Sequence, residues 1–183
     1  MQKKLRLLIL VLVFVLVLGG AYAAYHKLRT DVEVPAPPAA AERSDAFIDF
    51  TVYTAEGEQV KLSSLPGKPT LVNFWATWCP YCLQEFPEMQ SAFDAYGDKV
   101  NFAMVDATDG KRETVEKAKS FLEENGYTFP GYYDLDTDAL NAYGVYNLPT
   151  TILLDANGTI VFRHAGALTY EILEQQILKL LNS

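Results

Sequence analysis

The sequence has few of the residues that build metal sites and lipid anchors. Its 183 residues include two cysteines, Cys79 and Cys82, and two histidines, His26 and His164. A structural zinc ion needs four nitrogen or sulfur ligands, and the two histidines stand far apart in the sequence, so we expect no metal site. No cysteine lies near residue 20, which excludes a lipoprotein-type attachment site there.

The two signs of charge are distributed unevenly along the chain, and negative charge is missing from its start. The first 30 residues contain no acidic residue, whereas residues 31–183 hold ten basic and 23 acidic side chains. A surface with this negative excess repels nucleic acid and anionic lipid headgroups. We therefore expect no nucleic-acid partner.

An uncharged stretch of 19 residues runs from Leu7 to Tyr25, after three basic residues near the N-terminus. This length is about enough to cross a hydrocarbon core ~30 Å thick as a helix, and basic residues before it favour a cytoplasmic N-terminus. We interpret residues 1–30 as a single-pass membrane anchor with a transmembrane helix over about 7–25. A signal peptide is the alternative, because Ala21-Tyr22-Ala23 resembles a cleavage site. Both interpretations place the rest of the chain on the extracytoplasmic side of the cell membrane, and cleavage after Ala23 stays open.

The remainder divides into a tether and one domain. Residues 31–45 are rich in proline and alanine without periodicity, which predicts an extended linker. Residues 46–183 alternate between apolar runs of strand length and runs with helical periodicity, which predicts an α/β domain with a mixed sheet flanked by helices. The predicted strands cover 50–53, 59–62, 70–75, 100–105, 132–133, 151–154 and 159–162, and the predicted helices cover 80–96, 111–125, 136–143 and 168–181.

Cys79 and Cys82 stand at the start of a predicted helix with Pro80 and Tyr81 between them. This spacing places both sulfurs on one helix face, one turn apart, at a separation that a disulfide can bridge. The first cysteine lies at the helix N-terminus, where unpaired backbone N–H groups and the helix dipole stabilise a thiolate. We predict that Cys79 is an exposed nucleophile of low pKa and that Cys82 is a more buried resolving thiol. A purely structural disulfide that closes so short a loop would stabilise the fold little.

The run Leu71-Val-Asn-Phe-Trp-Ala-Thr-Trp-Cys-Pro-Tyr-Cys-Leu-Gln-Glu-Phe-Pro87 resembles the TlpA/ResA-like branch of the thioredoxin superfamily. The similarity covers roughly residues 46–181 and includes the leading hairpin, an insert around residues 111–143 and Leu148-Pro149-Thr150. It implies a thioredoxin-like fold with an N-terminal β-hairpin and a central αβ insert. It also implies a thiol–disulfide oxidoreductase that needs no bound cofactor, because the Cys79–Cys82 pair exchanges electrons with extracytoplasmic protein thiols and disulfides.

The resemblance assigns substrate-binding and tuning roles near the cysteines. Pro149 matches a proline that follows a cis peptide bond, and this kink would bring the backbone of Leu148 beside the sulfurs, where it can pair with an extended substrate strand. Trp78 precedes the first cysteine and forms either a lip for partners or part of the core. Pro80 and Tyr81 tune the reduction potential, which spans about −120 to −270 mV in related folds.

Glu85 lies on the helix face of Cys82, one turn further on, and matches an acidic residue near the active site of ResA-like proteins. A carboxylate there can take the proton of Cys82 during exchange, so we assign Glu85 a catalytic role; a solvated helix glutamate is the alternative. Asn73 stands where thioredoxin itself has a buried aspartate. An amide cannot act as a base, and we expect Asn73 to be a hydrogen-bonded core residue.

The direction of electron flow is not encoded in the motif. The resemblance favours a monomeric reductant that a membrane thiol electron carrier keeps reduced and that serves cytochrome c maturation. The alternatives are an oxidant, or an electron donor to another redox enzyme such as a methionine sulfoxide reductase. A copper carrier or other metal-binding module is a remote alternative, since His164 would have to lie at the cysteine pair. A peroxiredoxin is not expected, because Ala76 and Val72 occupy the positions where it requires threonine or serine and proline.

Overall fold

The computed structural model describes only part of the N-terminal region and most of the rest of the chain, namely residues 6, 14, 16–20, 22, 48–65 and 67–182. The chain divides into two units, Met1–Arg43 and Ser44–Ser183. Within the described residues no helix has the length and apolarity to cross a membrane. Residues 16–20 of the predicted span are described and helical, and most of the span 7–25 and the linker 31–45 lie outside the described residues.

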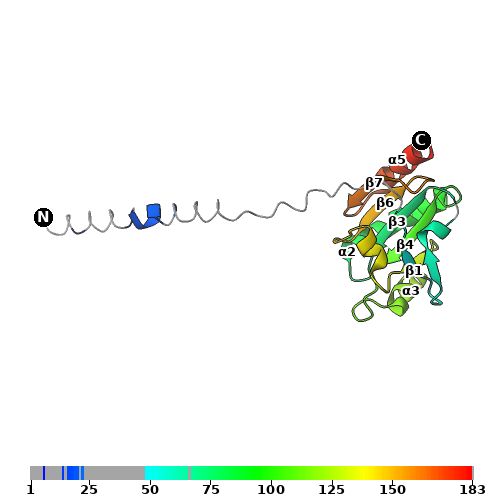
Figure 1. Ribbon diagram of the computed structural model, residues 1–183, viewed down its shortest axis with the longest axis horizontal. Coiled ribbons are helices and arrows are strands. Elements are labelled where there is room, and N and C mark those ends of the chain that lie inside the picture. The colour runs from blue at the N-terminus through cyan, green and yellow to red at the C-terminus, as the bar shows by residue number, and fades with distance from the viewer. Residues whose placement is uncertain are drawn as a thin grey trace. The chain divides into compact units, whose positions relative to one another are not determined.

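The second unit is built on one mixed sheet of seven strands in the order β2-β1-β5-β4-β3-β6-β7 (Figure 1). Strand β4 pairs in parallel with β3 and β5, and the other pairings are antiparallel. The strands are β1 (Thr51–Tyr53), β2 (Gln59–Lys61), β3 (Thr70–Trp75), β4 (Asn101–Asp106), β5 (Gly131–Tyr133), β6 (Thr150–Leu154) and β7 (Ile160–Ala165). The predicted mixed sheet with helices around it is therefore confirmed.

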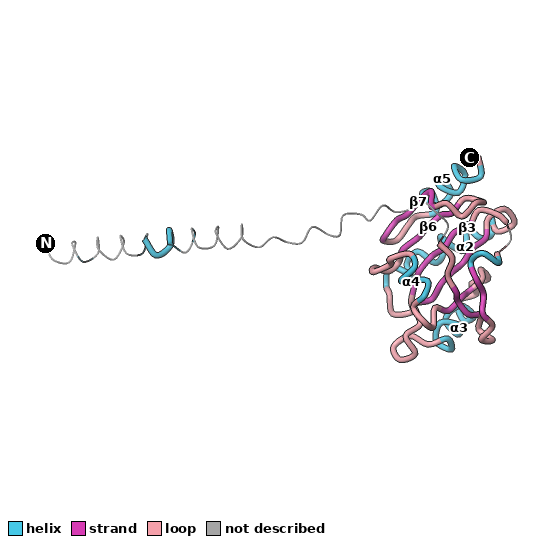
Figure 2. Tube along the Cα trace, in the orientation of Figure 1, coloured by secondary structure: helices cyan, strands magenta, loops and turns pink. Residues whose placement is uncertain are grey.

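Helices cover the sheet on both faces (Figure 2). They are η1 (Leu62–Ser64), α2 (Pro80–Tyr96), α3 (Val115–Glu124), α4 (Asp138–Ala142) and α5 (Tyr170–Leu181). The buried apolar residues of α2, α3 and α5 belong to one core cluster. Ala139 of α4 belongs to a second cluster, together with the buried residues of β1 and η1.

Strand β3 lies between these two clusters and supplies both. Its residues alternate, because successive side chains of a strand point to opposite faces: Leu71 and Trp75 join the first cluster, and Val72 and Phe74 join the second. Every residue of the strand is buried. The nearly continuous apolar run in the sequence therefore marked the central strand correctly.

Helix α3 begins four residues later than the predicted range 111–125. Asp109 accepts hydrogen bonds at Oδ1 from the backbone N–H groups of Lys111 and Glu113, at 2.8 and 2.9 Å. This side-chain pairing satisfies N–H groups that a helix would otherwise leave open, and it competes with helix formation. Thr114 then caps the helix, because its hydroxyl accepts from the N–H of Lys117 at 3.3 Å.

The four tyrosines of the inserted region lie in different environments. Tyr133 belongs to the first core cluster, whereas Tyr132 and Tyr143 belong to the second. Tyr146 is 91% exposed. The strand places Tyr132 and Tyr133 on opposite faces of the sheet, since neighbouring side chains alternate.

Candidate active site

The two cysteines lie where strand β3 leads into helix α2. Cys79 is the N-cap of α2 and Pro80 is its first residue, so the missing N–H of proline falls where a helix leaves N–H groups unpaired. A disulfide joins Cys79 to Cys82, with 5.3 Å between the Cα atoms. The N–H of Cys82 donates to Sγ of Cys79 at 3.2 Å. The helix N-terminus therefore directs a backbone donor at the first sulfur, and such a donor stabilises a thiolate.

The sulfur of Cys79 is more covered than the sequence predicted. Cys82 is fully buried, as expected, but Cys79 is also only 3% exposed. Cys79 belongs to the first core cluster, against which Leu148 packs. The predicted order of exposure holds, and the predicted openness of Cys79 does not hold in this disulfide form.

Two aromatic side chains lie in the open beside the covered pair. Trp78 is 40% exposed and Tyr81 is 64% exposed. The backbone before the pair turns tightly, because the N–H of Cys79 donates to the carbonyl of Ala76 at 3.1 Å. Trp78 is thus a surface residue at the site rather than a core residue.

The Leu148–Pro149 peptide bond is cis, in agreement with the resemblance. Strand β6 begins directly after it and pairs antiparallel with β3, with Thr150 opposite Phe74. Leu148 and Pro149 therefore lie at the end of the sheet where β3 runs on towards the cysteines. Pro149 is buried and Leu148 is half-buried.

Glu85 is a buried side chain, so the alternative of a solvated helix glutamate is wrong. It is 1% exposed. Its Oε1 accepts from Nδ2 of Asn73 at 2.7 Å, and its Oε2 accepts from the N–H of Leu168 at 3.1 Å. Burial raises the pKa of Glu85 to about 7, and these two hydrogen bonds oppose the rise. A carboxyl with this pKa can both hold and release a proton near neutral pH.

Asn73 is the core amide that we expected. It is fully buried in β3, and its Nδ2 also donates to Oγ1 of Thr151 on β6 at 3.1 Å. The amide therefore links the central strand, its neighbour and the carboxyl of Glu85.

A second buried acid, Glu113, was missed. It is fully buried, and its Oε2 accepts from both the N–H and the hydroxyl of Thr77, at 3.0 and 2.7 Å. Thr77 stands two residues before Cys79, so Glu113 fixes the segment that leads to the first cysteine. No local signal marked Glu113, because it stands in a polar stretch that we assigned to a helix.

Asp106, at the end of β4, is also fully buried. Burial raises its pKa to about 8, a hydrogen bond from Thr108 lowers it, and the charge of Glu113 raises it further. Its Oδ2 has no hydrogen-bond partner among the described residues. Asp106 and Glu113 are thus two buried acids whose charges interact.

The residues of the metal-binding alternative do not gather at the cysteines. His164 lies in β7, where its ring stacks on Phe162 with 6.3 Å between the centroids. Within residues 48–65 and 67–182 and the few described N-terminal positions, no group of three or more Cys, His, Asp or Glu side chains is arranged to hold a metal ion.

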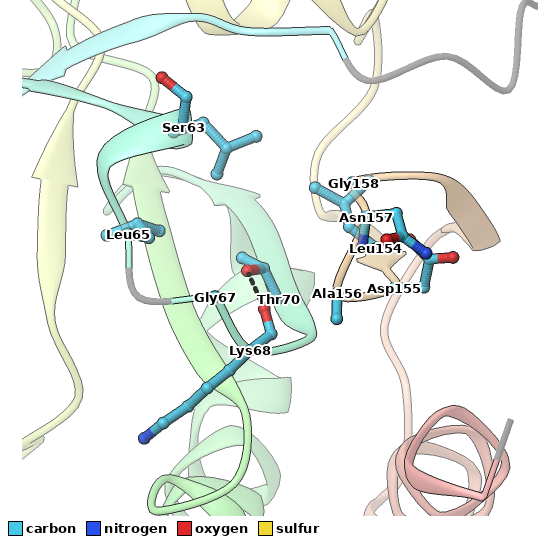
Figure 3. A pocket seen from close by; sticks show the side chains of 11 residues that line it. Ser63, Leu65, Gly67, Lys68, Thr70, Leu154, Asp155, Ala156, Asn157 and Gly158 are labelled. Carbon is cyan, nitrogen blue, oxygen red and sulfur yellow. Dashed lines mark hydrogen bonds between the residues drawn. The ribbon is translucent and has the colours of Figure 1, made fainter.

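The surface of the described residues includes two hollows. One, of about 230 Å³, lies between the start of β3 and the hairpin that joins β6 to β7 (Figure 3). The cysteines follow the opposite end of β3. The other, of about 390 Å³, lies beside Thr77 and is lined by residues of α3. Only the second adjoins the site.

Comparisons with known proteins agree with this geometry. The model of the AhpC/TSA family matches residues 44–163. The thiol-disulfide oxidoreductase ResA of Halalkalibacterium halodurans is 34% identical over 136 residues, which cover 74% of this chain and 75% of that protein. ResA of Bacillus thuringiensis is 32% identical over 188 residues and covers 98% of this chain and 99% of its own. The crystal structure of StoA from Bacillus subtilis matches with a TM-score of 0.62 at 30% identity, over 70% of this chain and 96% of that one, so the fold is thioredoxin-like.

Proposed function

Because the chain belongs to the AhpC/TSA family and is a thiol-disulfide oxidoreductase of the ResA type, we propose that it reduces disulfides of partner proteins outside the cytoplasm. The observation that carries this proposal is the pair at the start of α2: Cys79 receives a helix N–H at its sulfur, and Cys82 is buried one turn further on. A nucleophile and a resolving thiol need this arrangement.

The first step is attack by the Cys79 thiolate on one sulfur of a partner disulfide. A bond forms between Sγ of Cys79 and that sulfur, the partner disulfide breaks, and the other partner sulfur leaves as a thiolate that takes up a proton. Trp78 contacts the partner beside the sulfur. The backbone at Leu148, before cis Pro149, pairs with an extended segment of the partner.

The second step regenerates the disulfide of this chain. Glu85 takes the proton of Cys82, and the resulting thiolate attacks Sγ of Cys79. The mixed disulfide breaks, and the second partner sulfur leaves as a thiolate that takes up a proton. The partner then has two thiols, and this chain keeps the Cys79–Cys82 disulfide. A carboxyl whose pKa is raised to about 7 suits this transfer, because a general base works best when its pKa lies near the operating pH. Asn73 holds the carboxyl in place.

The N-terminal sequence supports the location. The uncharged run Leu7–Tyr25 after basic residues would hold the domain to the outer side of the cell membrane as a single-pass anchor. A thiol electron carrier of the membrane then returns the pair to the dithiol, and the protein acts as a monomer. The pair itself is the redox group, so no further cofactor is needed.

The mechanism is tested by trapping the mixed disulfide. A Cys82→Ser protein can attack but cannot resolve, so partners should remain bound to Cys79 in intact cells. Non-reducing electrophoresis with mass spectrometry reads out the adducts. The double variant Cys79→Ser, Cys82→Ser is the control and should trap nothing. If Cys79→Ser alone keeps full disulfide exchange, the assigned nucleophile is wrong; if the pair is mostly oxidised in growing cells, the direction is wrong.

A further inference from the structure

A positive side chain covers the aromatic lip of the site. The guanidinium carbon of Arg112 lies 4.0 Å from the ring centroid of Trp78, which is the geometry of a cation–π contact. Trp78 precedes the attacking cysteine directly in the chain. Arg112 is exposed, so its guanidinium can be reached by a partner at the surface.

The loop that carries Arg112 is fixed to the site rather than merely near it. Glu113, the next residue, is fully buried and accepts two hydrogen bonds from Thr77. Asp109 closes the loop from the other end by accepting the N–H groups of Lys111 and Glu113. Lys117 donates from Nζ to the carbonyl of Arg112 at 2.8 Å. Because the loop backbone is held on both sides of Arg112, this residue loses less conformational freedom on binding than a residue in a mobile loop.

The sign of this charge contrasts with the rest of the domain. Residues 31–183 carry 23 acidic and ten basic side chains, yet four of the ten basic ones stand within residues 111–119. All four are exposed. Nearby exposed acids are Asp109, which is tied into the loop, Glu116, and Glu56, whose carboxylate lies 3.9 Å from Nζ of Lys119. Arg112 forms no ion pair of this kind among the described residues. A local excess of one charge steers and selects partners of the opposite charge.

We propose that Lys111 and Arg112 form a cationic lip at which Arg112 selects partner segments that carry a carboxylate side chain beside the reactive cysteine. This inference rests on the proposed function. The carboxylate meets the guanidinium over Trp78 while the partner sulfur meets Cys79. The hollow beside Thr77 is not its place, because Glu116 and Glu124 line that hollow together with Lys117.

Two synthetic peptides, each closed by one disulfide, test the lip. One peptide has Asp beside one of its cysteines, and the other has Asn at the same position. The rate at which the reduced full chain reduces each peptide gives an Asp-to-Asn ratio. Arg112→Gln should lower this ratio roughly three-fold, the effect of one charge pair at ~6 Å in water, and the difference should shrink at high salt. Arg112→Lys keeps the charge and should restore much of the ratio.

The matched control is Lys61→Gln, which removes an exposed positive charge from β2, at the far edge of the sheet from β3. It should leave the ratio at the wild-type value. An equal ratio in the wild type and in Arg112→Gln would overturn the lip, even where both proteins reduce both peptides. If the wild type reduces neither peptide, the proposed function fails instead, so the two failures are distinct.

Discussion

At the scale of single residues, the buried carboxyl of Glu85 decides how the second thiol can react. Cys82 is fully buried and must lose its proton away from bulk water. The nearest base suggested by the sequence is the carboxyl one turn further along the same helix, and the structure buries it against Asn73. An amide at position 73 can hold the carboxyl and cannot replace it as a base.

We expect Glu85→Gln to slow the resolution of mixed disulfides by roughly 100-fold at pH 7.5, the lower end of the rate increase that a general base typically provides. In the wild type the rate should rise through a step near pH 7, where the carboxyl ionises, and this step should vanish in the variant. Single-turnover kinetics with a peptide disulfide between pH 5.5 and 9 measures both. Glu88→Gln removes a carboxyl from the same helix and is the control. Wild-type rates with an unchanged pH profile in Glu85→Gln would remove Glu85 from the mechanism.

The buried carboxyl of Asp106 should affect how the stability of the fold depends on pH, rather than the activity. Burial raises the pKa of Asp106 from 3.8 to about 8 in the folded protein. Between these two pH values the folded protein therefore keeps a proton that the unfolded protein has lost. The contribution of this proton to the free energy of unfolding is fully present below about pH 4 and is lost as the pH rises to about 8. The slope is about 1.4 kcal/mol per pH unit. This is the sign expected for a carboxyl buried mainly in its neutral form.

Asp106→Asn should therefore remove part of the pH dependence of unfolding. Between pH 6 and pH 8 we expect the wild type to lose about 2–3 kcal/mol more than the variant. Urea unfolding followed by circular dichroism at the two pH values measures the difference. Asp98→Asn, at an exposed position after α2, should behave like the wild type. Parallel pH dependences in the wild type and Asp106→Asn would show that the carboxyl does not titrate in this range.

At the scale of elements, the sequence predicted what local pattern determines. The strand at 70–75 and the helix at 80–96 have the predicted bounds, because an unbroken apolar run marks the first and Pro80 and Gly97 bracket the second. Hydrophobic periodicity reports the face that an element buries. It therefore suffices for elements that pack on the core along their whole length.

Helix α3 and the buried acids show where local pattern fails. The start of α3 is set by Asp109, whose hydrogen bonds turn the chain before the helix. The burial of Glu85 depends on Asn73, 12 residues away in sequence, and on Leu168, 83 residues away. The fit of Glu113 to Thr77 spans 36 residues. These contacts form only in the folded domain, so no local window of the sequence contains them.

At the scale of the whole molecule, the two ends of the sheet differ in chemistry. The cysteines, the cis proline and Arg112 lie where β3 ends, whereas the cavity of Figure 3 lies where β3 begins. A partner that docks at the cysteines therefore meets an aromatic and partly cationic surface on a domain that is otherwise acidic. This contrast gives orientation to the encounter, because like charges elsewhere repel an acidic partner from unproductive faces.

The proposed membrane anchor makes a prediction about where this encounter takes place. If residues 7–25 form an uncleaved anchor, the full chain should stay in the membrane fraction after washing with alkaline carbonate, and an external protease should digest the domain in cells stripped of their wall. A hydrophobic run of this length holds a protein in the bilayer because exposing it to water is unfavourable.

Mass spectrometry of the N-terminus tests the signal-peptide alternative. A mature chain that begins after Ala23 and appears in the medium would show a signal peptide. A variant with Glu in place of Leu12 and Val15 should leave the membrane, since a charge at the helix centre costs about 2.5–3.5 kcal/mol per residue. A domain that the protease reaches only after lysis would contradict the proposed location.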